Sequence, residues 1–292
     1  MLEITSPLTF ADEIGSLYQQ GLQPGDSTGW ESLNEYYTVA AGFWTVVTGI
    51  PSHGKSTWMD NLMLNLMQQG WAFIVYSPEN QPTSLHVAHL IEKTVRQPFR
   101  EGYAGRMDQQ TMHKAMRWLD ARLRLLRMSA DSPVVPDIHA ILFAAEEIIA
   151  ATWGPDAKVG IIIDPWNEMD HSPISGMNET QMTNHELMFF RHWIRNHNAH
   201  GWIVAHPQKP QRDKDGRLKK VGLYDINGSA AYYNKCDHGI IVRRLEDEDG
   251  RTEIEVEKCR FRHLGKKGTV ILEYNIGTQT YRDNVAIRPR SF

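Results

Sequence analysis

The sequence predicts an α/β fold with a mostly parallel twisted sheet, helices on both of its faces, and antiparallel strands added at the C-terminal end. Apolar, β-branched runs alternate with segments of helical periodicity through most of the 292 residues, which is typical of parallel sheets covered on both sides. The stretch GIPSHGKST, residues 49–57, lies between the first such run and the first long helical segment. The last three apolar runs follow one another without a helix between them, which favours antiparallel pairing.

The individual elements follow from periodicity and capping signals. Strands are expected at residues 45–48, 72–76, 123–128, 159–163, 202–205, 238–243, 252–258 and 269–274. Helices are expected at 57–69, 84–95, the second half of 100–121, 137–152 and 183–199. Thr183 and Glu186, three residues apart, are interpreted as a capping box that starts the last helix. The histidines at positions 185, 192, 197 and 200 are interpreted as a solvated helix face.

Residues 1–30 are expected to form an arm outside the sheet. They contain one short helical segment, at about residues 10–20, followed by GLQPGDSTG, which is rich in Gly and Pro. The expected organisation is therefore a linker helix or arm at 1–30, one large domain at 31–283 and a tail at 284–292.

Composition argues against several classes of protein. The formal net charge is −4, so any binding of nucleic acid must come from a local basic patch. Cys236 and Cys259 are the two cysteines of the sequence; two make neither a disulfide framework nor a zinc site, and a reducing compartment is the default. No apolar run reaches the length of a membrane span, and the first residues lack the pattern of a secretory signal, so no membrane partner is expected.

The stretch at 49–57 fits the pattern G-x-x-x-x-G-K-[ST]. Glycines allow a tight turn in which successive N–H groups point at phosphate oxygens, and the following helix presents its positive dipole end to the anion. Lys55 would supply charge to the outer phosphates, and the Ser56 hydroxyl would bind Mg²⁺. We therefore predict a site for ATP or another nucleoside triphosphate with Mg²⁺. Its residues are Gly49, Ser52, His53, Gly54, Lys55, Ser56 and Thr57.

Carboxylates at two other strand ends face the same crevice if the sheet is parallel. Asp164 ends the apolar run VGIII and is expected to hold Mg²⁺ beside Ser56. Glu79 follows the run AFIVY and is the candidate base that activates water. Glu168 and Asp170 are the competing carboxylates.

A basic stretch, KPQRDKDGRLKK, follows His206 closely. His206 ends a predicted strand, where a polar side chain can contact the γ-phosphate, although a lone histidine is more often structural. A charge run by itself is usually a solvated loop. The position of this run, directly after a strand end beside the phosphates, favours contact with nucleic acid instead. Its basic residues are Lys209, Arg212, Lys214, Arg217, Lys219 and Lys220.

Five motifs, in order, resemble the RecA-type motor domain of DnaB-like ring helicases. They are GIPSHGKST, YSPEN, GIIIDPWNEMD, WIVAHPQKP with DINGSAAYYNKCD, and EKCRFRHLGKKG. The resemblance covers roughly residues 25–282 and is greatest to the phage primase-helicases and the mitochondrial Twinkle helicases. It implies a RecA-like P-loop NTPase core and an ATP-dependent replicative DNA helicase. Such a motor hydrolyses nucleotide at subunit interfaces and moves along single-stranded DNA to unwind the duplex.

The resemblance also implies roles for single residues. Glu79 matches the catalytic glutamate, Asp164 the Walker B aspartate and His206 the polar sensor of the family. Arg260 resembles the arginine finger, with Lys258 as its companion, and these two would reach the γ-phosphate held by the neighbouring subunit.

Two loops bind single-stranded DNA in this family. The first corresponds to about residues 170–182 and is nearly uncharged here. The second is the basic stretch, closed by a segment in which Gly228 and Ser229 would donate N–H groups to a phosphate. Asn227 stands where the phage enzymes have Arg, which puts one contact in doubt. Tyr281 is expected to stack on the nucleotide base.

The partners that the resemblance implies are single-stranded DNA and further copies of the chain in a ring, a hexamer in this family, with a primase as a further candidate. One alternative is a RecA-like, DNA-stimulated ATPase that does not unwind, such as a recombinase relative or a loader. Another is a nucleotide-binding switch, against which Glu79, Arg260 and the basic stretch argue. The expected compartment is the cytoplasm of a bacterial or phage-infected cell, with an organelle matrix as the alternative.

Overall fold

One sheet organises the described part of the chain. The structure is a computed structural model, which describes residues 4–129, 131, 134–172, 176–208, 214, 219–226, 229–245 and 250–284. Within these residues, nine strands pair in the order β3-β2-β4-β5-β1-β6-β7-β8-β9. Strands β1 to β6 run parallel, and β7 to β9 continue the sheet beyond β6 as antiparallel strands. The predicted fold class is confirmed.

The strands lie close to the predicted runs, and β2 and β4 have the predicted bounds. The final short strand, β9, was not predicted. The strands are β1 (Trp44–Thr48), β2 (Ala72–Tyr76), β3 (Leu123–Leu126), β4 (Val159–Ile163), β5 (Ala199–Val204), β6 (His238–Arg244), β7 (Arg251–Cys259), β8 (Gly268–Asn275) and β9 (Thr280–Asp283).

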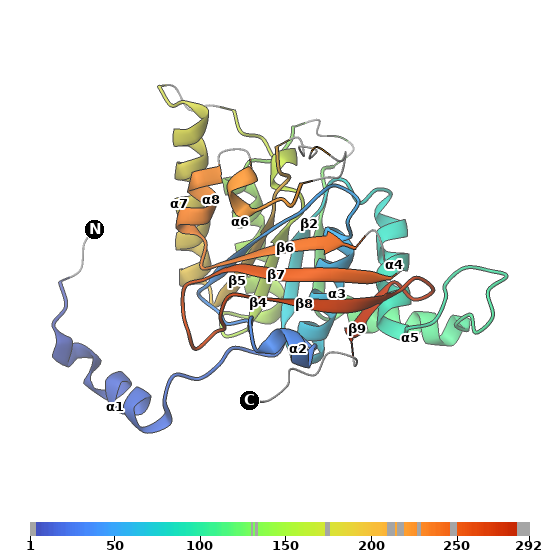
Figure 1. Ribbon diagram of the computed structural model, residues 1–292, viewed down its shortest axis with the longest axis horizontal. Coiled ribbons are helices and arrows are strands. Elements are labelled where there is room, and N and C mark those ends of the chain that lie inside the picture. Colours follow the sequence, from blue (N-terminus) through green and yellow to red (C-terminus); the bar gives the residue numbers. More distant parts are fainter. Residues whose placement is uncertain are drawn as a thin grey trace.

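Helices cover both faces of the sheet (Figure 1). One layer consists of α3 (Lys55–Gln68), α4 (Thr83–Val95) and α5 (Gln109–Asp120), and the other of α6 (Ile138–Ile148), α7 (Glu179–Asn196) and α8 (Ser229–Lys235). The other helical elements are η1 (Pro7–Phe10), α1 (Ala11–Gln20), α2 (Glu31–Asn34), the π-helix η2 (Ile149–Trp153), η3 (Trp166–Glu168) and η4 (Leu223–Asp225). Among the described helices, none combines the length and the apolar character needed to cross a membrane.

Two cores form because successive strand residues point to opposite faces. In β1, Val47 packs into the core that contains Trp58 of α3, and Val46 packs into the core that contains Phe190 of α7. All five residues of β1 are buried, as expected for a parallel strand covered on both sides. This arrangement brings the carboxyl ends of the parallel strands to one edge of the sheet.

Helix α7 begins earlier than predicted. Its capping box pairs Asn178 with Gln181, not Thr183 with Glu186. Thr183 Oγ1 instead donates to the carbonyl four residues earlier, at 3.0 Å. Glu186 is buried and accepts a hydrogen bond of 2.9 Å from His171 Nδ1, so tertiary contacts use the carboxylate that the predicted cap required. The predicted first DNA-binding loop is correspondingly shorter.

Helix α1 lies apart from the sheet (Figure 1), and none of its residues is buried. Ile14 and Leu17 are 54% and 49% exposed. The chain joins the body of the domain after this helix, where Asp26 and Val39 form an isolated bridge. The helix therefore presents apolar side chains that no other described part of the chain covers.

The interpretation of His200 as part of a solvated helix face is wrong, because this residue lies in β5 and is fully buried. Its Nδ1 is 2.7 Å from the Ala40 carbonyl oxygen, and its Nε2 is 2.9 Å from Thr45 Oγ1. His238, at the start of β6, is also fully buried, and neither of its ring nitrogens has a hydrogen-bond partner among the described residues. Burial lowers the pKa of each ring to about 3, so both imidazoles are neutral at pH 7.

These two rings predict a pH dependence of stability. The unfolded chain binds protons near pH 6.5 that the folded chain does not bind until about pH 3, so the free energy of unfolding falls as the pH drops below 6.5. Each ring contributes a slope of at most about 1.4 kcal/mol per pH unit. His238→Phe removes one of the two titrating rings but keeps an aromatic ring against Tyr37. In urea unfolding between pH 6.5 and 5, this variant should lose one ring's contribution to the dependence of the unfolding free energy on pH. His192→Phe, on the exposed side of α7, should not change it, and equal slopes in the two variants would contradict the assignment.

Candidate nucleotide site and its shared edge

The two glycines that define the motif at 49–57 lie against neighbouring parts of the sheet. The loop connects β1 to α3, so it lies at the N-terminus of that helix. At Gly49, with φ 149°, a Cβ would lie 2.2 Å from the Val242 carbonyl oxygen. At Gly54, with φ 91°, a Cβ would lie 2.8 Å from the Tyr281 hydroxyl. Side chains are therefore excluded at both positions, by backbone in one case and by a tyrosine in the other.

The remaining loop residues hold its curved backbone. Ser52 adopts a left-handed conformation with φ 65°. His53 Nδ1 accepts a hydrogen bond of 3.2 Å from the Arg244 N–H, which ties the loop to the end of β6. The Thr57 carbonyl accepts a hydrogen bond of 2.8 Å from Asn61 Nδ2 within α3.

The Lys55 amine lies inside the curve of the loop. This residue is 5% exposed, and its Nζ donates to the carbonyls of Gly49 at 3.0 Å and Ile50 at 3.3 Å. Burial lowers the pKa of Lys55, and the charges of Asp164 and Glu79 oppose that effect. The cation therefore lies among its own loop carbonyls with two carboxylates close by.

Asp164 lies beside the loop at the end of β4. Its N–H donates to the Tyr76 carbonyl at 2.9 Å, which fixes it against β2. Burial raises the pKa of Asp164 to about 6, whereas the hydrogen bond from the Ser56 hydroxyl opposes this shift. A hydroxyl and a buried carboxylate are oxygen ligands of the kind that Mg²⁺ prefers. The described residues contain no group of three or more His, Cys, Asp or Glu that could hold a metal, so phosphate oxygens and water would have to complete its coordination.

Glu79 and His206 lie together at the ends of β2 and β5. His206 Nε2 is 3.6 Å from Glu79 Oε1, and the Glu79 side chain is 53% exposed. The His206 N–H donates to Asn167 Oδ1 at 3.2 Å. Asn167 was not predicted; its position three residues after Asp164 was the available signal. The predicted base, sensor and metal residue thus lie at one edge of the sheet.

Aromatic residues flank the loop on the side of β8 and β9. Tyr281 is 7% exposed, and its ring centroid is 5.0 Å from that of Tyr274. This burial leaves little of the Tyr281 ring for a nucleotide base, and stacking by it stays a prediction. Tyr274 is only partly buried; burial raises its pKa and the nearby Arg244 charge opposes this. Tyr274 and Arg244 are further candidates for contact with the nucleotide base, and the sequence did not single them out.

Arg260 lies at the opposite edge of the sheet from Lys55. Strand β7 is antiparallel to β6, and Cys259 pairs with His238 at the start of β6. The nucleotide loop instead follows the end of β1, which runs parallel to β6. Since β6 has 7 residues, the two edges are roughly 20 Å apart. An arginine side chain cannot span that distance to the phosphate site of its own subunit.

Within the subunit, contacts with the end of α8 and the start of β6 hold the two cations. Arg260 Nη1 is 3.2 Å from Asp237 Oδ1, and its Nη2 donates to the Asn234 carbonyl at 3.1 Å. Lys258 Nζ donates to the Tyr233 carbonyl and lies 4.9 Å from the centroid of that ring. Asp237 is fully buried, and burial raises its pKa. Asp237 was not predicted, because its role depends on how β6 and β7 pair.

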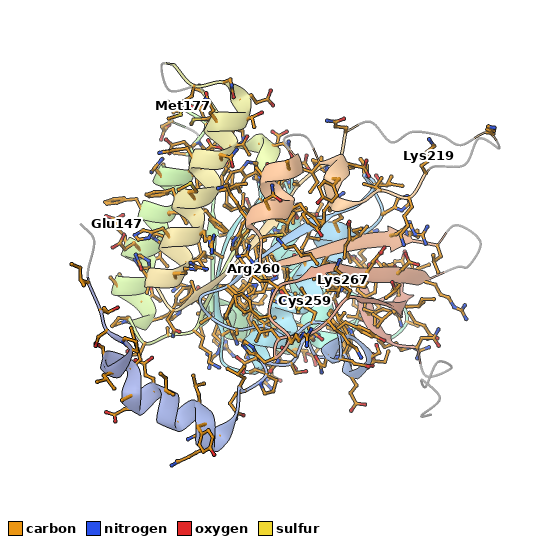
Figure 2. The ribbon with its side chains drawn as sticks, turned by 60° about the vertical axis from the view of Figure 1, so that its left-hand side comes forward. Glu147, Met177, Lys219, Cys259, Arg260 and Lys267 are labelled. Atoms are coloured by element: carbon orange, nitrogen blue, oxygen red, sulfur yellow. The ribbon has the colours of Figure 1, made fainter. Side chains whose placement is uncertain are left out.

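Several residues predicted to bind DNA lie outside the described residues, namely Lys209, Arg212, Arg217 and Gly228. Ser229 begins α8. Lys214 and Lys219 are exposed, and Lys219 lies well apart from Arg260 (Figure 2). Lys220 Nζ is 2.6 Å from Glu255 Oε2 and 3.7 Å from Glu253 Oε1.

A sequence relative and several solved structures resemble this chain. No protein-family profile matches it. The chloroplastic/mitochondrial Twinkle homolog of Arabidopsis thaliana is 36% identical over 286 residues, which is 94% of this chain and 39% of that protein. The predicted resemblance to the Twinkle helicases is confirmed over nearly the whole of this chain. The chain matches well under half of this longer relative.

Solved structures share the fold of this RecA-type domain. One of them, a separate ATPase domain, has a TM-score of 0.79 at 14% identity and covers 97% of this chain and 100% of its own. A DnaB-like replicative helicase, studied with its interactions with primase, has a TM-score of 0.75 at 16% identity over 97% of this chain and 68% of its own. The RadB recombinase has a TM-score of 0.58 at 15% identity over 88% and 99%. At these identities the likeness shows the fold.

The loop geometry gives a direct test of nucleotide binding. Gly54→Ala should weaken binding of a fluorescent ATP analogue at least about tenfold, because the new Cβ meets the Tyr281 hydroxyl and the backbone has φ 91°. Gly70→Ala is the matched control, with φ 97° and nothing within 4 Å of its Cβ; its affinity should stay close to that of the wild type. Unchanged binding by Gly54→Ala would show that this loop does not hold the nucleotide.

Proposed function

We propose that the chain is the motor domain of an ATP-dependent replicative DNA helicase that hydrolyses nucleotide between subunits and moves along single-stranded DNA. The observation that carries this proposal is the division of the catalytic residues between two opposite edges of the sheet. Lys55 and Glu79 lie at one edge and Arg260 at the other, so a second subunit is needed to bring the two groups together.

The residues at the first edge suit phosphoryl transfer to water. Lys55 would neutralise the outer phosphates, and Ser56 with Asp164 would hold Mg²⁺, which supplies charge neutralisation between those phosphates when bound. Glu79, which is half exposed, would take a proton from the attacking water. His206, next to Glu79, would respond to the presence of the γ-phosphate.

The cations of a neighbouring subunit would complete the site. The transition state spreads negative charge over the equatorial oxygens of the transferred phosphoryl group, and an arginine supplied by a neighbour stabilises that charge. Arg260 and Lys258 lie beside each other at the edge that could face a neighbour. We therefore expect an isolated subunit to hydrolyse nucleotide slowly.

Assembly into a ring, a hexamer in this family, has a candidate device in α1. Its apolar side chains are uncovered in the subunit, and burying such a face against another copy would stabilise the assembly. Helix α1 of the predicted arm (residues 1–30) would then belong to the interface, whereas the end of the arm, from Asp26 on, packs on the motor formed by residues 31–283. A primase is a further candidate partner.

Single-stranded DNA is the proposed track. Phosphate contacts by Lys214, Lys219 and the other basic residues after His206 would make binding depend on salt and nearly independent of sequence. No comparison favours a non-unwinding ATPase. The proposed compartment stays the cytoplasm of a bacterial or phage-infected cell, with an organelle matrix as the alternative; the Arabidopsis relative is named as chloroplastic/mitochondrial.

Mixing two inactive variants tests the shared site. Glu79→Gln and Arg260→Ala should each lower DNA-stimulated ATP hydrolysis by about 10³-fold. Mixed oligomers contain interfaces at which an intact Glu79 faces an intact Arg260, so the mixture should hydrolyse ATP at least about tenfold faster than either variant.

The matched control for this experiment is a mixture of Glu79→Gln with Lys55→Ala. Both changes damage the same edge, so no interface in that mixture is complete and its rate should stay low. Recovery in both mixtures, or in neither, would contradict action of Arg260 in a neighbouring site.

A further inference from the structure

One face of β7 carries a row of three glutamates, Glu253, Glu255 and Glu257. The alternate residues Ile254 and Val256 are 0% and 1% exposed and point into the core on the other face. This alternation follows from the two-residue repeat of a strand. The glutamate face is polar although it lies within the sheet, so it needs polar partners.

The row runs between the two functional edges of the sheet. Glu253 pairs with Arg243 near the end of β6, at the nucleotide edge, and Lys258 pairs with Gly239 near the start of β6. Arg260 follows directly beyond. A segment fixed to this row is therefore fixed to the strand that positions Arg260.

Two stems join the basic stretch that was predicted to bind DNA to the sheet, and the second begins at the last residue of that stretch, Lys220. We call residues 206–208 the departing stem and residues 220–226 the returning stem. Pro207 and Ile226 form an isolated antiparallel bridge that joins the two. The departing stem begins at His206, so the stems connect the sensor position to the basic stretch.

The returning stem lies along the glutamate row. Lys220 Nζ is 2.6 Å from Glu255 Oε2 and 3.7 Å from Glu253 Oε1. The Leu223 N–H donates to Glu257 Oε2 at 2.8 Å. Hydrogen bonds to an ionised carboxylate are among the stronger ones in proteins, and these glutamates are partly buried, which limits screening by water.

The contact of the returning stem that lies nearest to Lys258 and Arg260 is the one with Glu257. Glu257 immediately precedes Lys258, and the Arg260 N–H donates to the Asp237 carbonyl at 2.9 Å. Leu223 is fully buried, and a Cβ at Gly239 would lie 2.1 Å from its side chain. The returning stem is therefore packed against β6 through Leu223 and hydrogen-bonded to the end of β7 through Glu257.

We propose that Glu257, supported by Glu253 and Glu255, is a positioning residue that couples the DNA-binding stretch of one subunit to the Lys258 and Arg260 pair of the same subunit. This inference rests on the proposed function, and it adds a structural path by which bound DNA would affect ATP hydrolysis. DNA held by one subunit would adjust, through β7, the arginine that completes the neighbouring site. Removing a link of such a contiguous network weakens the coupling, while both ends can keep their own binding.

Glu257→Ala is the variant that removes the Leu223 bond. We expect DNA stimulation of ATP hydrolysis to fall about tenfold, the size associated with losing one charge-assisted hydrogen bond. Hydrolysis without DNA should stay at the wild-type rate, and affinity for a fluorescent single-stranded oligonucleotide should change by less than about threefold. Glu257→Gln keeps an oxygen acceptor for the Leu223 N–H and should restore most of the stimulation.

The matched control is Glu273→Ala, which breaks an ion pair of 2.7 Å with Arg282 at the far strands β8 and β9 and should leave stimulation unchanged. Thermal melting would verify folding. If Glu257→Ala does not fold, Glu255→Ala, which removes the shorter of the two described Lys220 ion pairs, should show a smaller loss in the same direction. Full stimulation in both folded variants would overturn the coupling, and so would a parallel loss of stimulation and DNA affinity. A wild type indifferent to DNA would overturn the proposed function, and the coupling with it.

Discussion

The parallel pairing of β1 with β6, followed by the antiparallel return of β7, is the constraint on which the rest of the account depends. Parallel strands place Lys55, Glu79, Asp164 and His206 at one edge, because each follows the carboxyl end of its strand. The reversal at β7 carries Arg260 to the other edge. If Lys55 and Arg260 serve one catalytic site, as proposed, a single subunit cannot bring them together, and the chemistry would be a property of an assembly.

The proposed nucleotide site contains charged groups that are buried before any ligand binds. Lys55 and Asp164 are 5% and 6% exposed, and desolvation acts against the charged form of both groups. Burying these charges lowers the stability of the folded subunit, and the charges of a bound nucleotide and divalent cation would offset that loss. The edge that carries Arg260 shows the same feature, since Asp237 is fully buried beneath Arg260. The domain thus has preorganised charge at both edges of the sheet. Preorganised charge is the arrangement that stabilises a transition state electrostatically.

Much of the fold could be predicted from the sequence, because apolar runs and glycine positions report local constraints directly. The bounds of β2 and β4 agree with the prediction, since both are continuous apolar runs ending in polar residues. The start of α7 could not be predicted in the same way: two capping patterns compete there, and burial of Glu186 against His171 decides between them. The partners Asn167, Asp237 and Glu257 were also missed, because their roles arise from strand pairing between distant segments. Tyr281 shows the converse, since a residue expected to stack on the nucleotide base is largely buried, with its hydroxyl next to Gly54.

The measurement that tests the shared site most directly is ATP hydrolysis per subunit over a wide range of protein concentration, with and without a single-stranded oligonucleotide. If Arg260 completes the site of a neighbour, the rate per subunit must rise steeply as subunits assemble, and DNA must increase it further. A rate per subunit that is independent of concentration and of DNA would contradict the account, because the site would then be complete within one subunit or would not be a motor at all.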